Sequence, residues 1–413
     1  MMPESKTYDV VVVGGGPAGA TAATDLASKG HSVLLLDRQG RIKPCGGAVP
    51  PRLLRDFNVP TSMLVAQVSS AEIVSPTDRR VNMPIEGGFV GMVDREHFDE
   101  WLRERAAEAG AERCAGTFEA FDRDTDGVAR IHYRPKNGGR DASLEVVRTR
   151  AVIGADGANS AVAREAVPRA GRVPYVFAYH EIVRSPQDGA AHFDSKRCDV
   201  YYNGRMSPDF YSWVFPHGDT TSIGTGSANK GFSLRNAVAD LRGITGLDAA
   251  ETIRKEGAPI PLKPRRKWDN DQDVLLAGDA AGVVAPASGE GIYYAMVCGR
   301  FAGEAVEEFL RTNDAKALAG ARKRFMKEHG RVFWILGIMQ YFWYKNDKRR
   351  ERFVSMCADP DVQRLTWEAY MNKKLVRARP GAHLRVFFKD VAHLLGLVQP
   401  DEESKLGPRR GVS

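Results

Sequence analysis

Residues 8–19 of the chain, YDVVVVGGGPAG, decide the fold. The β-branched run before the glycines predicts a buried parallel strand. Gly14, Gly16 and Gly19 then form a Gly-x-Gly-x-x-Gly pattern that opens a helix. The first glycine permits a tight turn, the second lets a pyrophosphate approach the backbone, and the third lets helix and strand pack closely. Because a helix N-terminus also offers free N–H groups to phosphates, the chain is predicted to begin with a dinucleotide-binding unit.

The second strand of this unit is expected from His31 to Leu36, with Asp37 at its end, 23 residues after Gly14. A carboxylate at this position can accept hydrogen bonds from ribose hydroxyls. A glycine pattern alone is a weak signal, but strand, helix and terminal Asp37 occur here in the expected order. Together they favour nucleotide binding over an ordinary turn.

Two more glycine-bearing segments follow far along the chain. The first, residues 152–160 (VIGADGANS), reads as a strand, a turn and a helix. In it, Asp156 and Gly157 form the turn, where Asp156 is expected to orient backbone and arginine groups around the dinucleotide. Arg164, just beyond, is expected to reach a phosphate.

The third segment, residues 273–280 (DVLLAGDA), is a predicted buried strand that ends at Gly278 and Asp279. Asp279 is expected to bind a ribityl hydroxyl. Residues 285–292 (APASGEGI) then open a helix whose N-terminus can face the pyrimidine side of an isoalloxazine and stabilise charge on a reduced flavin. The order and spacing of the three segments therefore predict a single FAD, and with it redox chemistry.

Composition limits the remaining possibilities. A chain of 413 residues predicts two to three domains. Its five cysteines are scattered without a Cys-x-x-Cys pair, which argues against a disulfide framework or a zinc site, so no metal is predicted, and a reducing cytoplasm is favoured. No signal or transit peptide is expected before the first strand, and no apolar run reaches the roughly 20 residues that span a bilayer.

The net charge of +7 is concentrated in one place. Residues 321–352 hold ten basic and three acidic side chains, a net of +7, around the aromatic run 332–344 (VFWILGIMQYFWY). Such a segment suits a helix at a membrane interface, and it equally suits a core helix of a C-terminal domain. Peripheral membrane contact through residues 321–353 is therefore one of two open interpretations. Nucleic-acid binding is not predicted, because no binding motif accompanies the charge.

The expected organisation is an α/β (α+β) chain with a discontinuous Rossmann-like FAD-binding domain, an antiparallel-sheet substrate domain and a C-terminal helical region. Residues 94–110 form an expected amphipathic helix, and residues 131–133 and 144–147 an expected hairpin. Few helical signals occur between residues 172 and 261. The predicted boundaries are 1–60, 94–125, 148–171 and 270–310 for the FAD-binding domain, 61–93 and 172–269 for the substrate domain, 311–399 for the helical region, and 400–413 for a mobile tail.

The three motifs resemble the flavoprotein superfamily typified by p-hydroxybenzoate hydroxylase. Two further stretches resemble the geranylgeranyl reductases within it, most closely those of (bacterio)chlorophyll biosynthesis. They are residues 43–50 (KPCGGAVP) and residues 209–216 (DFYSWVFP), the second matching a Tyr-x-Trp-x-Phe-Pro signature. The resemblance implies non-covalent FAD, NADPH as electron donor, and reduction of three double bonds of a geranylgeranyl chain to phytyl, on a (bacterio)chlorophyllide ester or as the diphosphate. It also implies a bacterial cytoplasmic enzyme, at the photosynthetic membrane if the segment 321–353 touches lipid.

The resemblance also assigns roles to residues. Tyr211, Trp213 and Phe215 alternate on an expected strand and are predicted to form an apolar wall for the isoprenoid. Cys45 either supplies or relays a proton, or only fills space. Arg95 resembles a flavin-contacting arginine, with a surface arginine as the alternative, and His217 is interpreted as a turn histidine. The predicted cofactor-binding set is Gly14, Gly16, Ala18, Gly19, Asp37, Arg38, Cys45, Gly46, Gly47, Arg95, Asp156, Gly157, Arg164, Gly278, Asp279, Pro286, Gly289, Gly291 and Ile292.

Rival functions remain open at this point. An FAD monooxygenase of the same superfamily would share fold and cofactor but consume oxygen. A non-catalytic flavoprotein docked on a membrane would let NADPH reduce the flavin without forming a product. A lipid saturase of the archaeal type would differ only in substrate. The oligomeric state and the NADPH site are not predicted.

Overall fold

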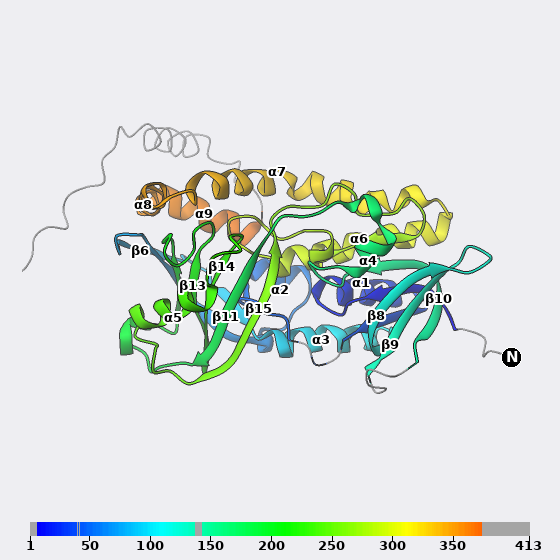
Figure 1. Cartoon of the computed structure of the whole chain (residues 1–413), viewed down its shortest axis with the longest axis horizontal. Coiled ribbons are helices and arrows are strands. Elements are labelled where there is room, and N and C mark those ends of the chain that lie inside the picture. The colour runs from blue at the N-terminus through cyan, green and yellow to red at the C-terminus, as the bar shows by residue number, and fades with distance from the viewer. Residues whose placement is uncertain (1–5, 39, 41, 137–142, 374–413) are drawn as a thin grey trace, which may run out of the picture.

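The computed structural model describes residues 6–38, 40, 42–136 and 143–373, and these form an elongated α/β molecule with two main sheets (Figure 1). The predicted α/β class is confirmed. Residues 374–399 of the expected helical region and the expected tail 400–413 lie outside the described residues.

The first sheet carries the glycine motifs at the ends of its strands. Parallel strands β2 (Val33–Asp37), β1 (Thr7–Val13), β10 (Glu145–Gly154) and β16 (Val274–Leu276) lie side by side, and their central residues are fully buried. The long strands β8 (Glu112–Arg123) and β10 extend beyond this core and pair with β9 (Ala129–Pro135). All three glycine motifs therefore meet at one edge, the carboxyl end of the parallel strands.

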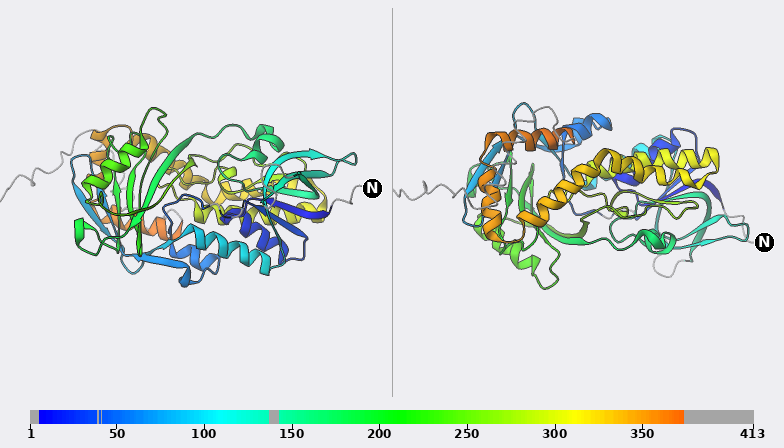
Figure 2. Two further views of the ribbon diagram at one scale, coloured as in Figure 1. Left: turned by 60° about the horizontal axis from the view of Figure 1, so that its bottom comes forward. Right: turned by 90° about the horizontal axis from the view of Figure 1, so that it is seen from above.

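Helices cover this sheet and set its motifs in place. Helix α1 (Pro17–Ala27) begins within the first glycine motif and packs between α3 (Arg95–Glu108) and α6 (Ile292–Thr312) (Figure 2). The expected amphipathic helix is α3: Phe98, Leu102 and Ala106 are buried, and Asp94 caps its N-terminus through the backbone N–H of Glu96, 2.8 Å away. The short helices α2 (Pro51–Asp56) and α4 (Ala161–Ala166) complete this half.

The second sheet has seven strands in the order β15-β11-β14-β13-β12-β5-β6. All neighbours are antiparallel except β12 and β5. The bounds are β5 (Ser70–Val74), β6 (Arg80–Pro84), β11 (Tyr175–Arg184), β12 (Arg197–Tyr201), β13 (Ser212–His217), β14 (Thr220–Ser227) and β15 (Thr252–Pro261). A small sheet of β3 (Ala48–Val49), β7 (Val90–Val93) and β4 (Leu64–Val68) joins the two halves.

Three helices close the described chain: α7 (Ala319–Trp343), α8 (Asp347–Met356) and α9 (Pro360–Asn372). Helix α7 follows the long axis of the molecule, while α8 and α9 cover the end that holds the second sheet (Figures 1 and 2). In the described ranges, no helix is both long enough and apolar enough to cross a membrane.

Two sequence interpretations need correction. The segments 144–147 and 151–154, expected as separate strands, form the single strand β10, whose first half pairs with β9 and whose second half pairs with β1. The region 172–261, in which few helical signals were noted, contains helix α5 (Leu234–Ile244). Ser233 caps α5, and Ala237, Val238 and Leu241 form its buried face. Over a window of about eight residues, the spacing of these apolar side chains matches the period of a helix and therefore predicts one.

Candidate active site

Two adjoining cavities lie where the glycine motifs meet the second sheet. One, of about 430 Å³, is lined by the glycine motifs, and the other, of about 280 Å³, by the aromatic signature and the Cys45 loop. They share Pro17, Lys43, Pro44, Ala258, Pro259, Asp279 and Ala295, so they adjoin along a common wall. We call them the nucleotide cavity and the apolar cavity.

The turn from β1 to α1 forms one side of the nucleotide cavity. Gly14 adopts a φ of +106°, which only glycine adopts without strain, and its N–H donates to the carbonyl of Leu36 at 2.8 Å. A Cβ atom on Gly19 would lie 1.8 Å from the Gly14 carbonyl oxygen, so this glycine is required for packing. A Cβ on Gly16 would meet nothing within 4 Å, because this glycine faces the cavity. The tight turn lies at Gly14, the close helix packing at Gly19 and the open backbone at Gly16.

Asp37 lies across this turn, at the end of β2. Its carboxylate accepts a hydrogen bond from the N–H of Gly15, and both Asp37 and Arg38 line the nucleotide cavity. Arg103 of α3 was not predicted. Its guanidinium pairs with Glu100 at 2.7 Å and donates to the Gly15 carbonyl at 3.4 Å, so a cation supports the turn that faces phosphates.

The second motif is organised by its aspartate. Asp156 accepts hydrogen bonds from the hydroxyl of Ser160 at 2.5 Å and the N–H of Ala161 at 2.6 Å, so it holds the start of α4. Arg164 donates to the carbonyls of Asn159 and Ser160, at 2.7 and 3.1 Å. Both side chains line the nucleotide cavity. Asp156 therefore orients backbone groups, while the guanidinium of Arg164 is engaged with its own turn.

Lys43 and Asp279 meet at the junction of the two cavities, where they form an ion pair. Asp279 follows β16, and Lys43 begins the segment 43–50 that contains β3. The pair places one carboxylate and one ammonium group beside the space that joins the polar and apolar parts of the site. Lys43 belongs to the quoted motif, but its pairing partner could not be read from the sequence.

Close backbone packing places the Cys45 loop against the aromatic strand β13. A Cβ on Gly46 would lie 3.0 Å from the ring of Phe215, and one on Gly47 (φ +71°) would lie 2.5 Å from Nε2 of His217. His217 is partly buried, its Nδ1 lies 3.0 Å from the Phe215 carbonyl, and burial lowers its pKa. This histidine therefore packs beneath the loop.

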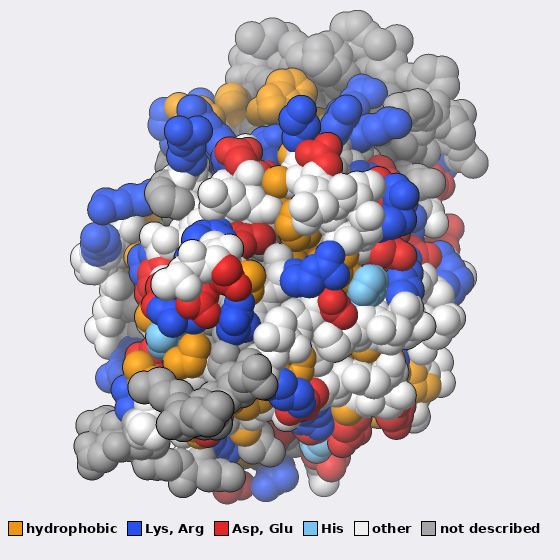
Figure 3. Space-filling view, turned by 90° about the vertical axis from the view of Figure 1, so that its right-hand side faces the viewer, with side chains coloured by type: hydrophobic (Ala, Val, Ile, Leu, Met, Phe, Trp, Pro, Cys, Tyr) orange, Lys and Arg blue, Asp and Glu red, His pale blue; other side chains and the backbone are white. Residues whose placement is uncertain are grey.

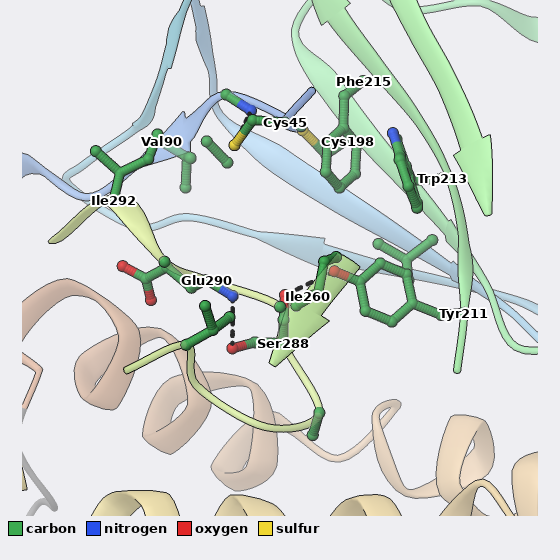
Figure 4. A pocket seen from close by; sticks show the side chains of 18 of the residues that line it. Cys45, Val90, Cys198, Tyr211, Trp213, Phe215, Ile260, Ser288, Glu290 and Ile292 are labelled. Atoms are coloured by element: carbon green, nitrogen blue, oxygen red, sulfur yellow. Dashed lines mark hydrogen bonds between the residues drawn. The ribbon is translucent and has the colours of Figure 1, made fainter. Parts of the chain in front are cut away.

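The aromatic wall lies on one side of the apolar cavity, as Figure 4 shows. The Tyr211 hydroxyl donates to the carbonyl of Ser288 at 2.6 Å, which ties the wall to the segment before α6. The Trp213 indole N–H donates to the hydroxyl of Ser222 at 3.0 Å. Ring centroids of Tyr211, Trp213 and Phe215 follow one another at 6.0 and 6.2 Å. Each polar tip has a partner, so apolar ring surface faces the cavity.

Arg95 lies within the site. It starts α3 next to the Asp94 cap, is buried, and pairs with Asp99 through two hydrogen bonds of 2.8 and 2.7 Å. Burial disfavours the charge of this guanidinium, but Asp99 and the thiol of Cys45 outweigh that effect and raise its pKa. Arg95 and Cys45 both line the apolar cavity, so a cation held by Asp99 lies in the same wall as the thiol. The surface alternative for Arg95 is wrong.

The thiol of Cys198, on β12, also lines the apolar cavity. Burial raises the pKa of this thiol, which stays protonated. Cys198 was not singled out from the sequence, because a lone cysteine in a strand gives no functional signal.

Of the predicted cofactor-binding residues, all except Gly19 and Pro286 line one of the two cavities. Sequence reasoning missed the far side of the apolar cavity, formed by Glu290 and by Trp367 and Tyr370 of α9. Glu290 lies within the quoted segment 285–292, whereas the two α9 residues carry no local signal. In the described residues, no cluster of three or more His, Cys, Asp or Glu side chains has the arrangement of a metal site.

The two cavities fit the two ends of FAD. A glycine turn, a helix N-terminus and the carboxylate of Asp37 suit an adenosine pyrophosphate. The N-terminus of α6, beginning after Gly291, lies at the apolar cavity and suits the pyrimidine edge of a flavin. The open space over Gly16 is where a pyrophosphate can approach the backbone. The fold and the site therefore define an FAD-binding oxidoreductase.

Comparisons with known proteins agree. The family model described as "FAD binding domain" matches residues 7–319. A geranylgeranyl diphosphate reductase from Rhodobacter capsulatus is 58% identical over 393 residues, covering 95% of this chain and 99% of the relative. A geranylgeranyl diphosphate reductase from a Synechocystis species is 35% identical, covering 94% and 97%. The chain belongs to the geranylgeranyl reductase family of FAD-dependent oxidoreductases.

A solved structure has the same fold. A geranylgeranyl bacteriochlorophyll reductase-like protein from Thermoplasma acidophilum superposes with a TM-score of 0.77 at 23% identity, covering 91% of this chain and 99% of that one.

Proposed function

We propose that this protein uses FAD and NADPH to saturate three double bonds of a geranylgeranyl chain, giving phytyl, in (bacterio)chlorophyll biosynthesis. The observation that carries the proposal is the apolar cavity, walled by Tyr211, Trp213 and Phe215 and adjoining the nucleotide cavity. An isoprenoid is flexible and without polar handles, so it requires a dry groove of this kind to hold one double bond at a reacting position. The names of the relatives support the same chemistry.

When bound, reduced FAD supplies the hydride for the double bond. The residues of this chain do the remaining work. The aromatic wall excludes water and holds the chain, and the N-terminus of α6 stabilises negative charge in the pyrimidine region. Cys45 supplies the proton that the second carbon requires. Cys45 lines the apolar cavity together with the aromatic wall, which places its thiol beside the space that the chain would occupy.

The proposal is tested by an anaerobic assay with purified holoenzyme, NADPH and geranylgeranylated bacteriochlorophyll in detergent, followed by mass spectrometry. We expect the tail to gain hydrogen pairs stepwise and to stop at phytyl. The same assay with geranylgeranyl diphosphate shows which form of the chain is accepted. Flavin bleaching by NADPH without any change in tail mass would refute the proposal, and oxygen consumption would then separate a monooxygenase from a non-catalytic flavoprotein.

We also propose that the enzyme lies on the cytoplasmic side of the photosynthetic membrane and touches it through the segment 321–353. Trp334, Ile338 and Tyr341 of α7 are 68%, 47% and 76% exposed, and their spacing of four and three residues places them on one face. Phe333 and Trp343 of the same run are buried. Some rings of the aromatic run therefore pack in the core, as in a core helix, while others are exposed to solvent, where a membrane-interface helix would present them.

Charge supports this orientation. Lysine and arginine side chains gather along the upper edge of the molecule, around exposed apolar atoms (Figure 3). Exposed aromatic rings among cations suit anionic headgroups. Sedimentation with phosphatidylglycerol vesicles tests the proposal. We expect the double variant Trp334→Ser with Tyr341→Ser to lose most of its binding, and the matched control Tyr175→Ser, which removes a ring exposed on β11, to bind like the unaltered protein. Equal binding by all three proteins would refute membrane contact through α7.

A further inference from the structure

Helix α9 forms part of the wall of the apolar cavity. Trp367 and Tyr370 line the same space as Cys45 and Tyr211, although Trp367 comes 156 residues after Tyr211 (367 − 211) and 322 residues after Cys45 (367 − 45) in the chain. The indole N–H of Trp367 is buried without a hydrogen-bond partner, and so is Oε1 of Glu290, which lines the cavity as well. Buried polar atoms normally have partners. An apolar chain offers neither atom a hydrogen bond, so the part of α9 in this site rests on its place in the cavity wall.

An ion pair fastens α9 to this wall. Lys373 follows the last turn of the helix in the left-handed conformation and pairs with Glu290. The two side chains are only 2% and 7% exposed, and the Lys373 ammonium lies 3.6 Å from the centroid of the Tyr370 ring. A second anchor is nearby, where Arg52 of α2 donates to the carbonyl of Asn372. The end of α9 is thus held by contacts with the Glu290 segment and with α2.

The position of Glu290 relates α9 to the aromatic wall. In Figure 4, Glu290 lies across the cavity from Tyr211 and Trp213. Since Lys373 contacts Glu290 and the Tyr370 ring, α9 approaches the cavity from the Glu290 side. The aromatic rings of α9 and those of the segment 211–215 thus belong to the wall of one cavity.

A buried ion pair needs a functional explanation, because apolar residues of the same size stabilise a fold equally well. Burial raises the pKa of Glu290 and lowers that of Lys373, so each group depends on the other to remain charged. The pair joins the segment before α6, which lines the flavin end of the site, to the helix that carries Trp367 and Tyr370. Its effect is to set the distance between these two walls.

We infer that Trp367 and Tyr370 bind the isoprenoid chain, and that Glu290 and Lys373 are positioning residues that hold α9 against it. The identity of the ligand rests on the proposed function, whereas the placement of α9 rests on the contacts above. Loss of an aromatic wall residue weakens the binding of a flexible chain more than it lowers the rate at which an already bound chain is reduced. The expected signature is therefore a higher KM with a smaller change in kcat, together with release of partly reduced tails.

The first experiment measures ligand binding without turnover. Geranylgeraniol is titrated into the oxidised holoenzyme, and the flavin absorbance change reports binding. We expect Trp367→Ala and Tyr370→Ala to weaken binding about tenfold or more. The matched control is Thr366→Ala, an exposed position on the same helix that is not part of the cavity wall. Flavin content, measured by absorbance, verifies that each variant is folded and loaded.

The second experiment tests the ion pair by a double-mutant cycle with Glu290→Gln and Lys373→Met. Amide hydrogen exchange across residues 360–372 and geranylgeraniol affinity are both measured. Each single variant leaves one buried group unpaired, so we expect faster exchange in α9 and weaker binding. The double variant removes both groups, and we expect it to recover most of each loss.

The outcomes separate the two proposals. Failure of the unaltered holoenzyme to bind geranylgeraniol would overturn the proposed function and the isoprenoid role of α9 with it. Binding by the unaltered enzyme, with unchanged affinity in Trp367→Ala and Tyr370→Ala, would overturn the role of α9 alone. Unchanged exchange in both single variants, or a double variant as impaired as the worse single one, would overturn the positioning role of the ion pair.

Discussion

Gly16→Ala should abolish tight FAD binding without weakening the apoprotein. An added Cβ meets no atom within 4 Å, and the φ of −76° and ψ of −175° suit alanine, so the protein itself has nothing to displace. The methyl group instead enters the nucleotide cavity at the turn where a pyrophosphate approaches the backbone. Inserting one carbon into a tightly packed contact costs about 1–3 kcal/mol, which corresponds to a roughly 5- to 150-fold increase in the Kd for FAD.

The measurement is a titration of deflavinated protein with FAD, followed by quenching of flavin fluorescence, beside thermal unfolding of the apoprotein. The unfolding free energy of the Gly16→Ala apoprotein should stay within about 1 kcal/mol of the unaltered protein. Gly19→Ala is the contrast, because its Cβ would lie 1.8 Å from the Gly14 carbonyl oxygen and must destabilise the apoprotein itself. Unchanged FAD affinity in Gly16→Ala, or a clear loss of apoprotein stability, would refute the assignment of this turn to the pyrophosphate.

Three further outcomes follow from the site. Arg95→Met leaves the Asp99 carboxylate buried without its partner and should lower the unfolding free energy, measured in urea, by about 3–5 kcal/mol. The double variant Arg95→Met with Asp99→Asn should recover part of this loss. If the two changes were simply additive, the pairing would be contradicted. Burial lowers the pKa of His217, so the stability that its neutral form contributes is present above the unfolded pKa of about 6.5 and is lost as the pH falls below it. Between about pH 7.5 and pH 5, the unfolding free energy should therefore decrease less for His217→Gln than for the unaltered protein. Parallel curves of unfolding free energy against pH would contradict this expectation. Tyr211→Phe removes the donor to the Ser288 carbonyl but keeps the ring. Thermal unfolding should therefore show a free energy of unfolding lower by about 1 kcal/mol, while the affinity for geranylgeraniol stays nearly unchanged. A large loss of affinity would show that the hydroxyl itself contacts the ligand.

Local chemistry explains what the sequence predicted well. Gly14 and Gly19 of the β1–α1 turn stand where a Cβ atom does not fit, and Asp37 ends a strand of apolar residues. Each of these features depends on residues that are close together in the sequence, so it can be recognised from the sequence alone. The order of the three glycine segments then places them at one sheet edge, because parallel strands end on the same side.

The parts that could not be predicted depend on contacts between distant segments. The pattern of α9 shows that the helix packs against something, but it does not show that Trp367 and Cys45 line one cavity. The pairing of Glu290 with Lys373 spans 83 positions. Asp156 presented a different difficulty, because an aspartate before a helix suits both a ligand contact and a cap, and only the geometry shows the hydrogen bonds to the start of α4.

The strand order of the first sheet has a consequence for biosynthesis. The parallel core is completed by β16, which adds to β10 only after about two thirds of the chain has been made. Asp279 and the N-terminus of α6 come later still, so a nascent chain that already carries the first glycine turn holds only one end of the flavin site. FAD can therefore bind only after most of the polypeptide has left the ribosome. A chain released before β16 is made has neither bound flavin nor the strand that covers the edge of β10, so this edge stays exposed to aggregation.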